Sequence, residues 1–332
     1  MAVSAGGRQR GVALLTVLLL VATMSVLVVA MLDDVRFALR RTANAEALAQ
    51  AQWYALGAEA LAAAQVERLV RRDPVATTLD GDWNGRAFVF PVEHGAIRAR
   101  LRDATACFNL NSVVQGAGDL LSRRPEGVRQ YIALLCALEF PDAQAQALAD
   151  ALADWVDSDQ QREGLGHEDA GYARGRGGYR TGDTLLAEPS ELRAIRGYTP
   201  EVYARLRPHV CALPTTAPSP VNVNTLQAAD APVLAMLAGG ELDVARAQRV
   251  IAARPAGGWR SVAAFWDAPG LRGAVPADAA LSQVRLTTRY FRLRAEVDHG
   301  PAQAQLSALI EYDPDLPDAR PRIRVRRWSH EE

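Results

Sequence analysis

Residues 12–32 read VALLTVLLLVATMSVLVVAML, an almost unbroken run of apolar side chains near the start of the chain. Its only polar members are Thr16, Thr23 and Ser25. At roughly 1.5 Å per residue, a helix of this length spans a bilayer core of about 30 Å. The run is therefore predicted to be a transmembrane helix, and this prediction decides the class of protein.

The charges on either side of the run predict its orientation. Arg8 and Arg10 precede it, and Asp33 and Asp34 follow it. By the positive-inside rule, the N-terminus faces the cytoplasm and the remainder of the chain faces outward. The alternative is a secretory signal peptide, which has a shorter apolar core ending in a small-residue cleavage site. No such site follows Leu32 cleanly.

Gly11 and Val12 form the junction between a short charged leader, residues 1–11, and the apolar run. A protease that cuts after Gly11 removes the leader and leaves the helix intact, and this arrangement resembles a type IV prepilin. Strong helix formers continue past the membrane without a proline until Pro74. One helix from Val12 to about Arg72 would be about 90 Å long, as in the spine of pilins and pseudopilins.

Thr16 stands at the fifth position counted from Val12, where pilin-like proteins usually carry a glutamate. A lone carboxylate in hydrocarbon is costly unless it is paired, and its partner in a pilin fibre is the free N-terminal amine of the neighbouring subunit. A subunit that lacks the glutamate needs no neighbour there, which suits the first subunit at a tip. The alternative is a simple substitution in a divergent pilin.

Five further segments resemble the K-type minor pseudopilins of type II secretion systems (GspK-like), and they occur in family order along the chain. They are DATACFNLNSV (103–113), ALADWVDSDQQREGLGHEDAGY (151–172), EPSELRAIRGY (188–198), VNVNT (221–225) and TTRYFRLRAEV (287–297). The resemblance implies an α+β fold in which a small antiparallel-sheet pilin-like domain, residues 33–103 and 285–332, is interrupted by a large α-helical insertion domain, residues 104–284.

The same resemblance implies a function and a set of partners. It places the chain in the cell inner membrane as a single-pass protein with its C-terminal part in the periplasm. There it would sit at the tip of the pseudopilus with the I-type and J-type minor pseudopilins, above the H-type pseudopilin. Prepilin peptidase would remove the leader, and the inner-membrane assembly platform would build the filament, which this subunit initiates and caps for protein export across the outer membrane.

The alternation of apolar and polar residues predicts where the strands lie. Residues 83–103 contain two apolar-rich runs around 93–95 and predict a β-hairpin. Residues 286–312 alternate on both sides of Gly300 and predict a second antiparallel pair, and residues 322–328 predict a short final strand. These strands bracket a middle region with almost none.

That middle region, residues 105–284, consists of short helical stretches that start at Ser, Thr or Asp and stop at Gly or Pro, which predicts an irregular helical domain. It contains a weak internal repeat, because FNLNS at 108–112 and VNVNT at 221–225 each precede a helical region. We expect their asparagines to cap helices or hold turns through side-chain to backbone hydrogen bonds.

An acidic loop near residue 160 is the candidate metal site. Counted from Asp157 as position one, oxygen-bearing side chains fall at positions one, three, five, seven and twelve, as in the calcium loop of an EF-hand. These residues are Asp157, Asp159, Gln161, Glu163 and Glu168, with Asp169 next to the last. Arg162 replaces the turn glycine, no helix is evident after the loop, and a solvated acidic loop is the alternative. The resemblance implies calcium, and Trp155 is expected to anchor the loop to the core.

The remaining composition argues against other classes of function. Lysine and arginine together number 37 against 38 acidic residues, and every basic residue is arginine. This balance does not predict nucleic-acid binding. The five histidines show no metal-ligand spacing, and there is no Walker loop, dinucleotide fingerprint or nucleophile elbow, so a non-enzymatic protein is predicted.

Two alternatives of function and one of covalent structure remain open at this stage. The chain could be a minor pilin of a type IV pilus, or a membrane-anchored helix-hairpin-helix DNA-binding protein, since VNVNT followed by helices resembles the opening of such modules. Cys107, Cys136 and Cys211 allow one disulfide with a leftover thiol, or three buried free thiols.

Overall fold

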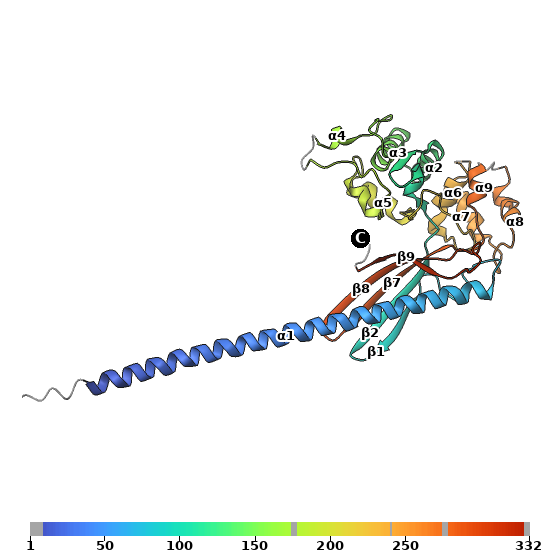
Figure 1. The fold of residues 1–332 in the computed structure, drawn as a ribbon. Helices are drawn as coiled ribbons and strands as arrows, with labels where there is room; N and C mark the ends of the chain where they lie inside the picture. Colours follow the sequence, from blue (N-terminus) through green and yellow to red (C-terminus); the bar gives the residue numbers. More distant parts are fainter. Residues whose placement is uncertain (1–8, 174–177, 240, 274–277, 329–332) are drawn as a thin grey trace, which may run out of the picture.

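A single helix, α1 (Gln9–Arg72), forms the spine of the molecule (Figure 1). The computed structural model describes residues 9–173, 178–239, 241–273 and 278–328. Helix α1 has 64 residues and is about 96 Å long at roughly 1.5 Å per residue. Within the described residues it is the one helix long and apolar enough to cross a membrane, and the side chains of its apolar run are exposed. The predicted long helix is confirmed.

A five-stranded antiparallel sheet packs against the second half of α1, with strand order β1-β2-β7-β8-β9. Its strands are β1 (Ala87–Val92), β2 (Gly95–Asp103), β7 (Tyr290–His299), β8 (Ala302–Glu311) and β9 (Arg322–Arg327). The β1–β2 turn at His94 and the β7–β8 turn at Gly300 both use positive φ angles, +60° and +53°. Both predicted hairpins and the final strand are confirmed.

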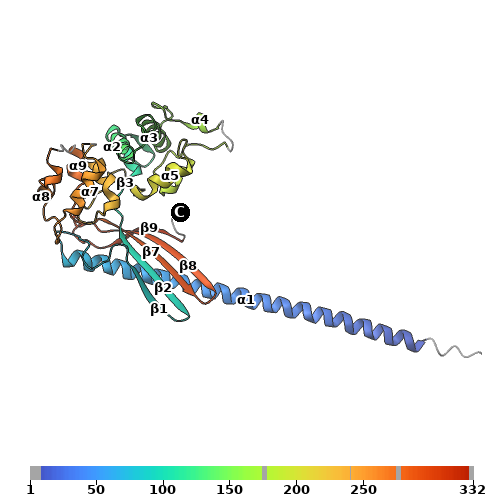
Figure 2. The same cartoon turned by 180° about the vertical axis from the view of Figure 1, so that it is seen from behind.

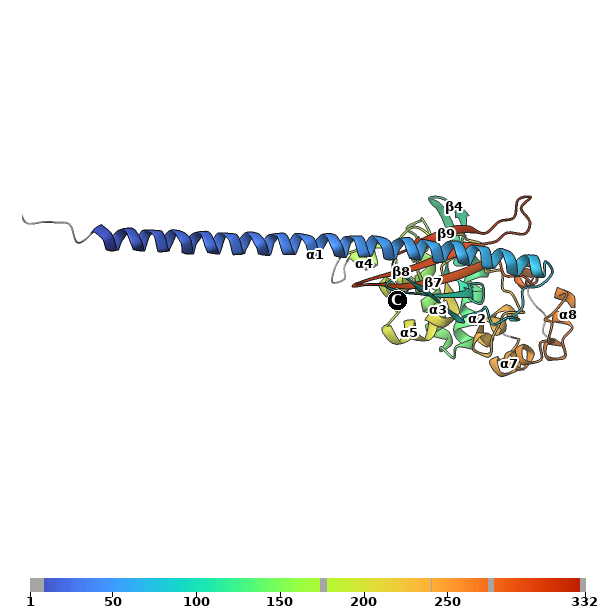
Figure 3. The same cartoon turned by 90° about the horizontal axis from the view of Figure 1, so that it is seen from below.

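Small residues on α1 allow the helix to lie close to the sheet. Ala51, Ala55, Ala58 and Ala62 recur at helical spacing, so they share one face, and all four are buried. They meet alternate residues of the central strands, among them Phe291, Leu293, Ala295 and Val297 of β7 and Leu306, Ala308 and Ile310 of β8. The first half of α1 projects beyond the sheet, and none of the other helices and strands that the structure describes lies beside it (Figure 3).

The insertion leaves the sheet after Asp103 and returns at Tyr290. Asp103 pairs with Phe291 in the β2–β7 ladder, so the two ends of the insertion lie side by side. The α-helices between them are α2 (Pro125–Ala137), α3 (Asp142–Val156), α4 (Asp169–Ala173), α5 (Pro200–Leu206), α6 (Ala231–Leu237), α7 (Val244–Ala252), α8 (Val262–Trp266) and α9 (Asp278–Gln283). Short 3-10 helices lie at η1 (Leu110–Val113), η2 (Pro189–Ala194), η3 (Arg207–His209), η4 (Ala228–Asp230) and η5 (Pro269–Leu271).

Four short strands in the insertion were not predicted. β3 (Phe108–Asn109) pairs in parallel with β6 (Val210–Cys211), and β4 (Val114–Ala117) forms a hairpin with β5 (Leu120–Arg123). These strands are only two to four residues long, too short for alternation to stand out in the sequence.

The insertion is built around its own hydrophobic core, separate from the core between α1 and the sheet. Tyr131 and Leu134 of α2, Leu152 of α3, Leu234 of α6 and Phe265 of α8 are all at most 1% exposed. The insertion lies on the side of the sheet away from α1 (Figure 2). A compact helical body of this kind agrees with the predicted α+β fold.

Candidate metal centre and framework of the insertion

The acidic side chains gather at the C-terminal end of α3 and in the loop that follows. Oxygens of Asp157, Asp159 and Glu168 all lie within 4.8 Å of one another, which is the spacing of ligands around one cation. Asp157 caps α3, and Glu168 directly precedes α4. The expectation that no helix follows the loop was wrong, because the short helix α4 begins at Asp169 and encloses the loop between two helices.

Burial leaves several of these carboxylates without hydrogen-bond partners. Asp157 is 2% exposed and Glu168 is 7% exposed. Among the described residues, no donor reaches Asp157 Oδ1, either carboxylate oxygen of Glu168, or Asp183 Oδ1. An unpaired buried carboxylate is costly, whereas hard divalent cations bind such oxygens. The cluster could therefore hold a hard divalent cation.

The electrostatics of the cluster agree with this assignment. Burial, followed by repulsion from Asp159, raises the pKa of Asp157 to about 7. Burial, followed by repulsion from Asp154, raises the pKa of Glu168 to about 8. Burial also raises the pKa of Asp154 to about 6. A bound cation would oppose all three shifts, because it stabilises the ionised form of each carboxyl.

Arg123 of β5 neutralises the acidic groups beside the cluster. Its Nη2 lies 2.5 Å from Asp150 Oδ1, its Nε lies 3.1 Å from Glu163 Oε2, and its Nη1 lies 4.0 Å from Asp154 Oδ1. Glu163, one of the predicted ligands, thus pairs with an arginine. Asp150 and Asp154 were missed by sequence reasoning, although their spacing to Asp157 places all three on one face of the end of α3.

The other two predicted ligands, Gln161 and Asp169, lie outside this group of three carboxylates. The backbone N–H of Gln161 donates to Asp159 Oδ1 at 2.8 Å. Asp169 Oδ1 accepts from the backbone N–H of Thr181 at 2.9 Å and from its hydroxyl at 2.8 Å. Of the six predicted residues, the structure therefore gathers the carboxylates of Asp157, Asp159 and Glu168.

Trp155 fastens this loop to the core of the insertion. Its side chain is 7% exposed, and its ring makes edge contacts with Tyr172 at 5.1 Å and Tyr179 at 6.1 Å between ring centroids. The predicted anchoring role is confirmed. Trp155 is also a fluorophore, and it lies two residues before Asp157 in the chain.

The first asparagine segment holds two distant loops in place. Asn111 Oδ1 accepts from Leu186 N at 2.8 Å, and its Nδ2 donates to Leu186 O at 2.9 Å and to Leu213 O at 2.8 Å. Asn109 Oδ1 accepts from the backbone N–H of Asn111 at 3.3 Å. Both asparagines are fully buried.

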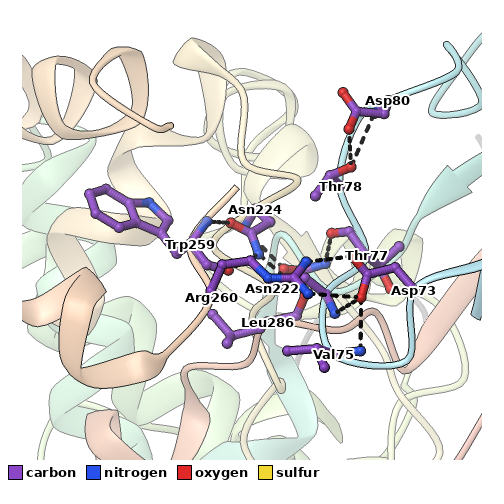
Figure 4. A network of polar contacts seen from close by, with 11 residues as sticks. Asp73, Val75, Thr77, Thr78, Asp80, Asn222, Asn224, Trp259, Arg260 and Leu286 are labelled. Carbon is purple, nitrogen blue, oxygen red and sulfur yellow. Dashed lines mark hydrogen bonds and ion pairs between the residues drawn. The ribbon is translucent and has the colours of Figure 1, made fainter. Parts of the chain in front are cut away.

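The second segment makes the equivalent set of bonds (Figure 4). Asn224 Oδ1 accepts from Trp259 N at 2.6 Å, and its Nδ2 donates to Trp259 O at 3.0 Å and to Leu286 O at 3.4 Å. Asn222 Oδ1 accepts from the backbone N–H of Asn224 at 2.9 Å. The internal repeat in the sequence is therefore a structural repeat, and the predicted role of the asparagines is confirmed.

This second segment also ties the insertion to the end of α1 (Figure 4). Asn222 Nδ2 donates to Thr77 O and to Thr288 Oγ1, both at 2.9 Å. Arg260 forms an ion pair with Asp73, which follows the last residue of α1. The insertion is thus fixed where the spine ends.

A disulfide joins Cys107 and Cys211 across the β3–β6 pair. Cys136 is an exposed free thiol. Of the two alternatives left by the sequence, one bridge with a leftover thiol is the one observed.

The predicted cleavage point lies in the first turn of α1, which begins at Gln9. Residues 1–8 of the predicted leader lie outside the described residues. Thr16 faces outward on α1, and its hydroxyl donates to Ala13 O at 2.9 Å. The hydroxyl of Thr16 therefore has a hydrogen-bond partner within its own helix.

An apolar helix that becomes the spine of an antiparallel sheet, with a helical body inserted between two of its strands, defines a pilin-like subunit. Two family models, both described as type II secretion system (T2SS), protein K, match the chain, one at residues 106–215 and the other at residues 221–287. The chain belongs to the type II secretion system protein K family. It is accordingly a pseudopilin, a structural and non-enzymatic component of protein transport.

Relatives and a solved structure extend this match over nearly the whole chain. Type II secretion system protein K of Klebsiella pneumoniae is 40% identical over 304 residues, covering 92% of this chain and 93% of the relative. The protein K of Aeromonas hydrophila is 36% identical over 310 residues, covering 91% and 93%. A chain in the crystal structure of the GspK-GspI-GspJ complex from enterotoxigenic Escherichia coli matches with a TM-score of 0.74 and 28% identity, covering 87% of this chain and 99% of that chain.

Proposed function

We propose that this protein is the minor pseudopilin at the tip of the type II secretion pseudopilus, where it assembles with the I-type and J-type minor pseudopilins. The observation that supports the proposal most directly is the structural match over 87% of this chain to a chain from a crystal structure of the GspK-GspI-GspJ complex. In this role the subunit initiates the filament, sits above the H-type pseudopilin and caps the end. Neither a type IV pilus nor DNA binding has comparable support, given the family match and the balanced charge.

The shape of the molecule supports a cap. The insertion stands over the sheet on the side away from α1 (Figure 1), so its bulk would obstruct a further subunit stacked above it. Thr16 replaces the glutamate that would otherwise need the N-terminal amine of a neighbour. Together these features suit a subunit with partners below and beside it.

The cap role is tested by deleting residues 105–284. Because Asp103 and Phe291 are neighbours in the ladder, a short linker can rejoin the sheet. We expect the shortened chain to insert in the membrane at normal levels but to lose co-purification with its I-type and J-type partners, together with secretion. Normal secretion with the shortened chain would refute the cap.

Location and processing follow from the same proposal. The helix would anchor the chain in the inner membrane through a single pass, with the sheet and insertion in the periplasm, where a disulfide can persist. Prepilin peptidase would cut between Gly11 and Val12 before the assembly platform takes up the subunit. Replacing Gly11 by a bulky residue should leave a full-length chain, whereas the parent should lose the mass of residues 1–11. A parent that keeps its full-length mass would exclude cleavage here.

Calcium is the ion we assign to the carboxylate cluster, with Asp157, Asp159 and Glu168 as ligands. Two single substitutions test the ligands. Asp157→Asn and Glu168→Gln, made separately, should each lower calcium affinity at least about tenfold, because the charge of the ligands sets the affinity of such sites. Calcium should quench or enhance Trp155 fluorescence and protect the loop from protease. The matched control is Asp119→Asn, an exposed acid on the β4–β5 hairpin, which should bind calcium as the parent does. Equal protease resistance with and without calcium would contradict the assignment.

A further inference from the structure

The acidic loop that follows α3 divides into two halves that are held in different ways. The first half, residues 158–166, is fastened to the insertion by hydrogen bonds and ion pairs within the chain. The second half, residues 167–173, includes Glu168, and no donor among the described residues reaches either oxygen of its buried carboxylate. The first half is therefore complete without a cation, whereas the second half leaves a buried carboxylate unmatched.

Strand β5 holds the beginning of the first half. The N–H of Ser158 donates to Leu121 O at 2.9 Å, and the N–H of Leu121 donates to Ser158 Oγ at 3.0 Å. Arg123 lies two residues further along β5, so its side chain leaves the strand on the same face as that of Leu121. From there its guanidinium group reaches the acidic groups of α3 and of the loop.

Two aspartates of α3 bind the backbone of the first half. The N–H of Leu165 donates to Asp150 Oδ2 at 3.1 Å. The N–H of Glu163 donates to Asp154 Oδ1 at 3.4 Å and to Asp154 Oδ2 at 3.3 Å. Asp150 is 1% exposed and Asp154 is 0% exposed. The backbone of the loop is thus bound by two carboxylates that solvent hardly reaches.

Two glycines let the loop approach these carboxylates closely. A Cβ on Gly164 would lie 2.3 Å from Asp150 Oδ2, and a Cβ on Gly166 would lie 2.1 Å from Asp154 Oδ2. Gly164 also has a φ of +53°, which favours glycine. The conformation of residues 164–166 therefore depends on these two carboxylates.

Arg123 is the counter-ion that these carboxylates require. Of the basic side chains that the structure describes, it is the one that pairs with Asp150, Asp154 and Glu163. A buried carboxylate that loses its charged partner is strongly destabilising. Without the guanidinium group, Asp150 and Asp154 would be buried without such a partner, and the loop backbone lies directly on them.

We propose that Arg123 is a positioning residue of the metal site. It holds residues 158–166 in place when no cation is bound, so calcium has to order only residues 167–173. This inference rests on the calcium site proposed above. Every residue that is ordered on binding costs conformational entropy, so a site whose first half is already formed binds its ion more tightly than an unformed one.

Charge and positioning predict opposite effects of Arg123→Gln on calcium affinity. By charge alone, removing a guanidinium group beside a cation site strengthens binding, because like charges repel. If Arg123 positions the loop, the same substitution weakens binding at least about tenfold, since calcium must then order the first half as well. Arg123→Lys keeps a positive charge beside Asp150, so its affinity should stay within about threefold of the parent.

The binding experiment uses the full chain in a non-ionic detergent. Calcium is titrated by calorimetry into the parent and the variants after a chelator has been applied and removed, and thermal unfolding shows that each variant is folded. The matched control is Arg129→Gln, an exposed arginine of α2, which should change affinity less than about twofold. Calcium affinity that stays the same or rises in Arg123→Gln, or that falls as far in Arg123→Lys, would overturn the proposal.

A second experiment follows amide hydrogen exchange in chelator and does not depend on the ion. The N–H groups of Glu163 and Leu165 should exchange at least about tenfold faster in Arg123→Gln than in the parent, because their acceptors lose the group that holds them. Arg129→Gln should exchange as the parent does, and unchanged exchange in Arg123→Gln would overturn the proposal. If the parent binds no calcium, the calcium assignment fails, and the exchange experiment alone decides whether Arg123 holds the first half.

Discussion

Glu59 of α1 and Arg326 of β9 form a bidentate ion pair between the long helix and the last strand. Arg326 Nε lies 2.7 Å from Glu59 Oε2, and Arg326 Nη2 lies 2.6 Å from Glu59 Oε1. Glu59 is 7% exposed on α1, whereas Arg326 on β9 is more open to solvent. The pair joins residues 267 positions apart and closes the sheet edge onto the helix.

Replacing Arg326 by Gln should lower the free energy of unfolding by about 1–2 kcal/mol, because the buried Glu59 carboxylate loses its charged partner while solvent screens part of the loss. Denaturant unfolding of the chain in detergent measures this. Arg322→Gln, an exposed position on the same strand, is the control and should change stability by less than about 0.5 kcal/mol. Equal effects at the two positions would show that the ion pair is not important for stability.

The Cys107–Cys211 bridge closes a loop of 104 residues, so removing it should be costly. With Ser at both positions, we expect a loss of about 4 kcal/mol, because the unfolded chain regains the freedom of a long loop. Thermal unfolding measures this. Without reductant the parent should have a higher Tm than the variant, and with reductant the two Tm values should be the same. The control Cys136→Ser should leave the Tm unchanged. If the Tm of the parent is the same with and without reductant, the prediction is wrong.

Asn224→Ala should cost about 2–3 kcal/mol, because it leaves the backbone N–H and the carbonyl of Trp259 without their partner, whereas the carbonyl of Leu286 keeps its bond from the N–H of Thr77. The structural repeat predicts that Asn111→Ala costs a similar amount. Gln115→Ala, an exposed amide on β4, is the control and should be nearly neutral. If Asn111 and Asn224 differ by several kcal/mol, the two segments are not energetically equivalent.

Without a cation, the chain should lose stability as the pH rises from about 5 to about 8. The pKa values of Asp157 and Glu168 in the folded chain are about 7 and about 8, whereas carboxyls in the unfolded chain titrate near 4. The folded state therefore holds protons that the unfolded state has released, and stability falls with pH in that window. Calcium should flatten the dependence, since it stabilises the ionised carboxylates.

The pH effect is measured as the Tm in a chelator across this range. Glu168→Gln should reduce the slope because it removes the group with the highest pKa, whereas Asp119→Asn should keep it. A chelated parent whose Tm rises steadily from pH 5 to pH 8 would rule out protonated carboxyls in the cluster.

Much of the fold follows from local patterns. Residues 12–72 contain no proline and, apart from Gly57, no residue that disfavours a helix, so α1 could be predicted from Val12 to its end at Arg72, although the structure begins it three residues earlier, at Gln9. Alternation with a glycine at the turn was sufficient for the β1–β2 and β7–β8 hairpins. The pairing of β2 with β7 is different, because it joins segments separated by the whole insertion and no local signal specifies it.

The residues of the candidate metal site also divide into those that the sequence could predict and those that it could not. Asp157, Asp159 and Glu168 could be found because they lie within one short loop. Arg123 could not, since β5 reaches the cluster only through tertiary packing. The choice of Cys211 over Cys136 as the partner of Cys107 likewise depends on a Cα–Cα distance of 5.8 Å, which the sequence does not contain.

The unbroken course of α1 has a mechanical consequence. From Gln9 to Arg72 it contains no proline, and its second half is packed against β7 and β8. Kinks in helices need a cause such as proline or a bulge, so an axial push applied within the membrane cannot be absorbed on the way. Helix α1 therefore moves as one rigid rod. A shift of one residue relative to neighbouring helices would displace the sheet and the insertion by about 1.5 Å along the helix axis.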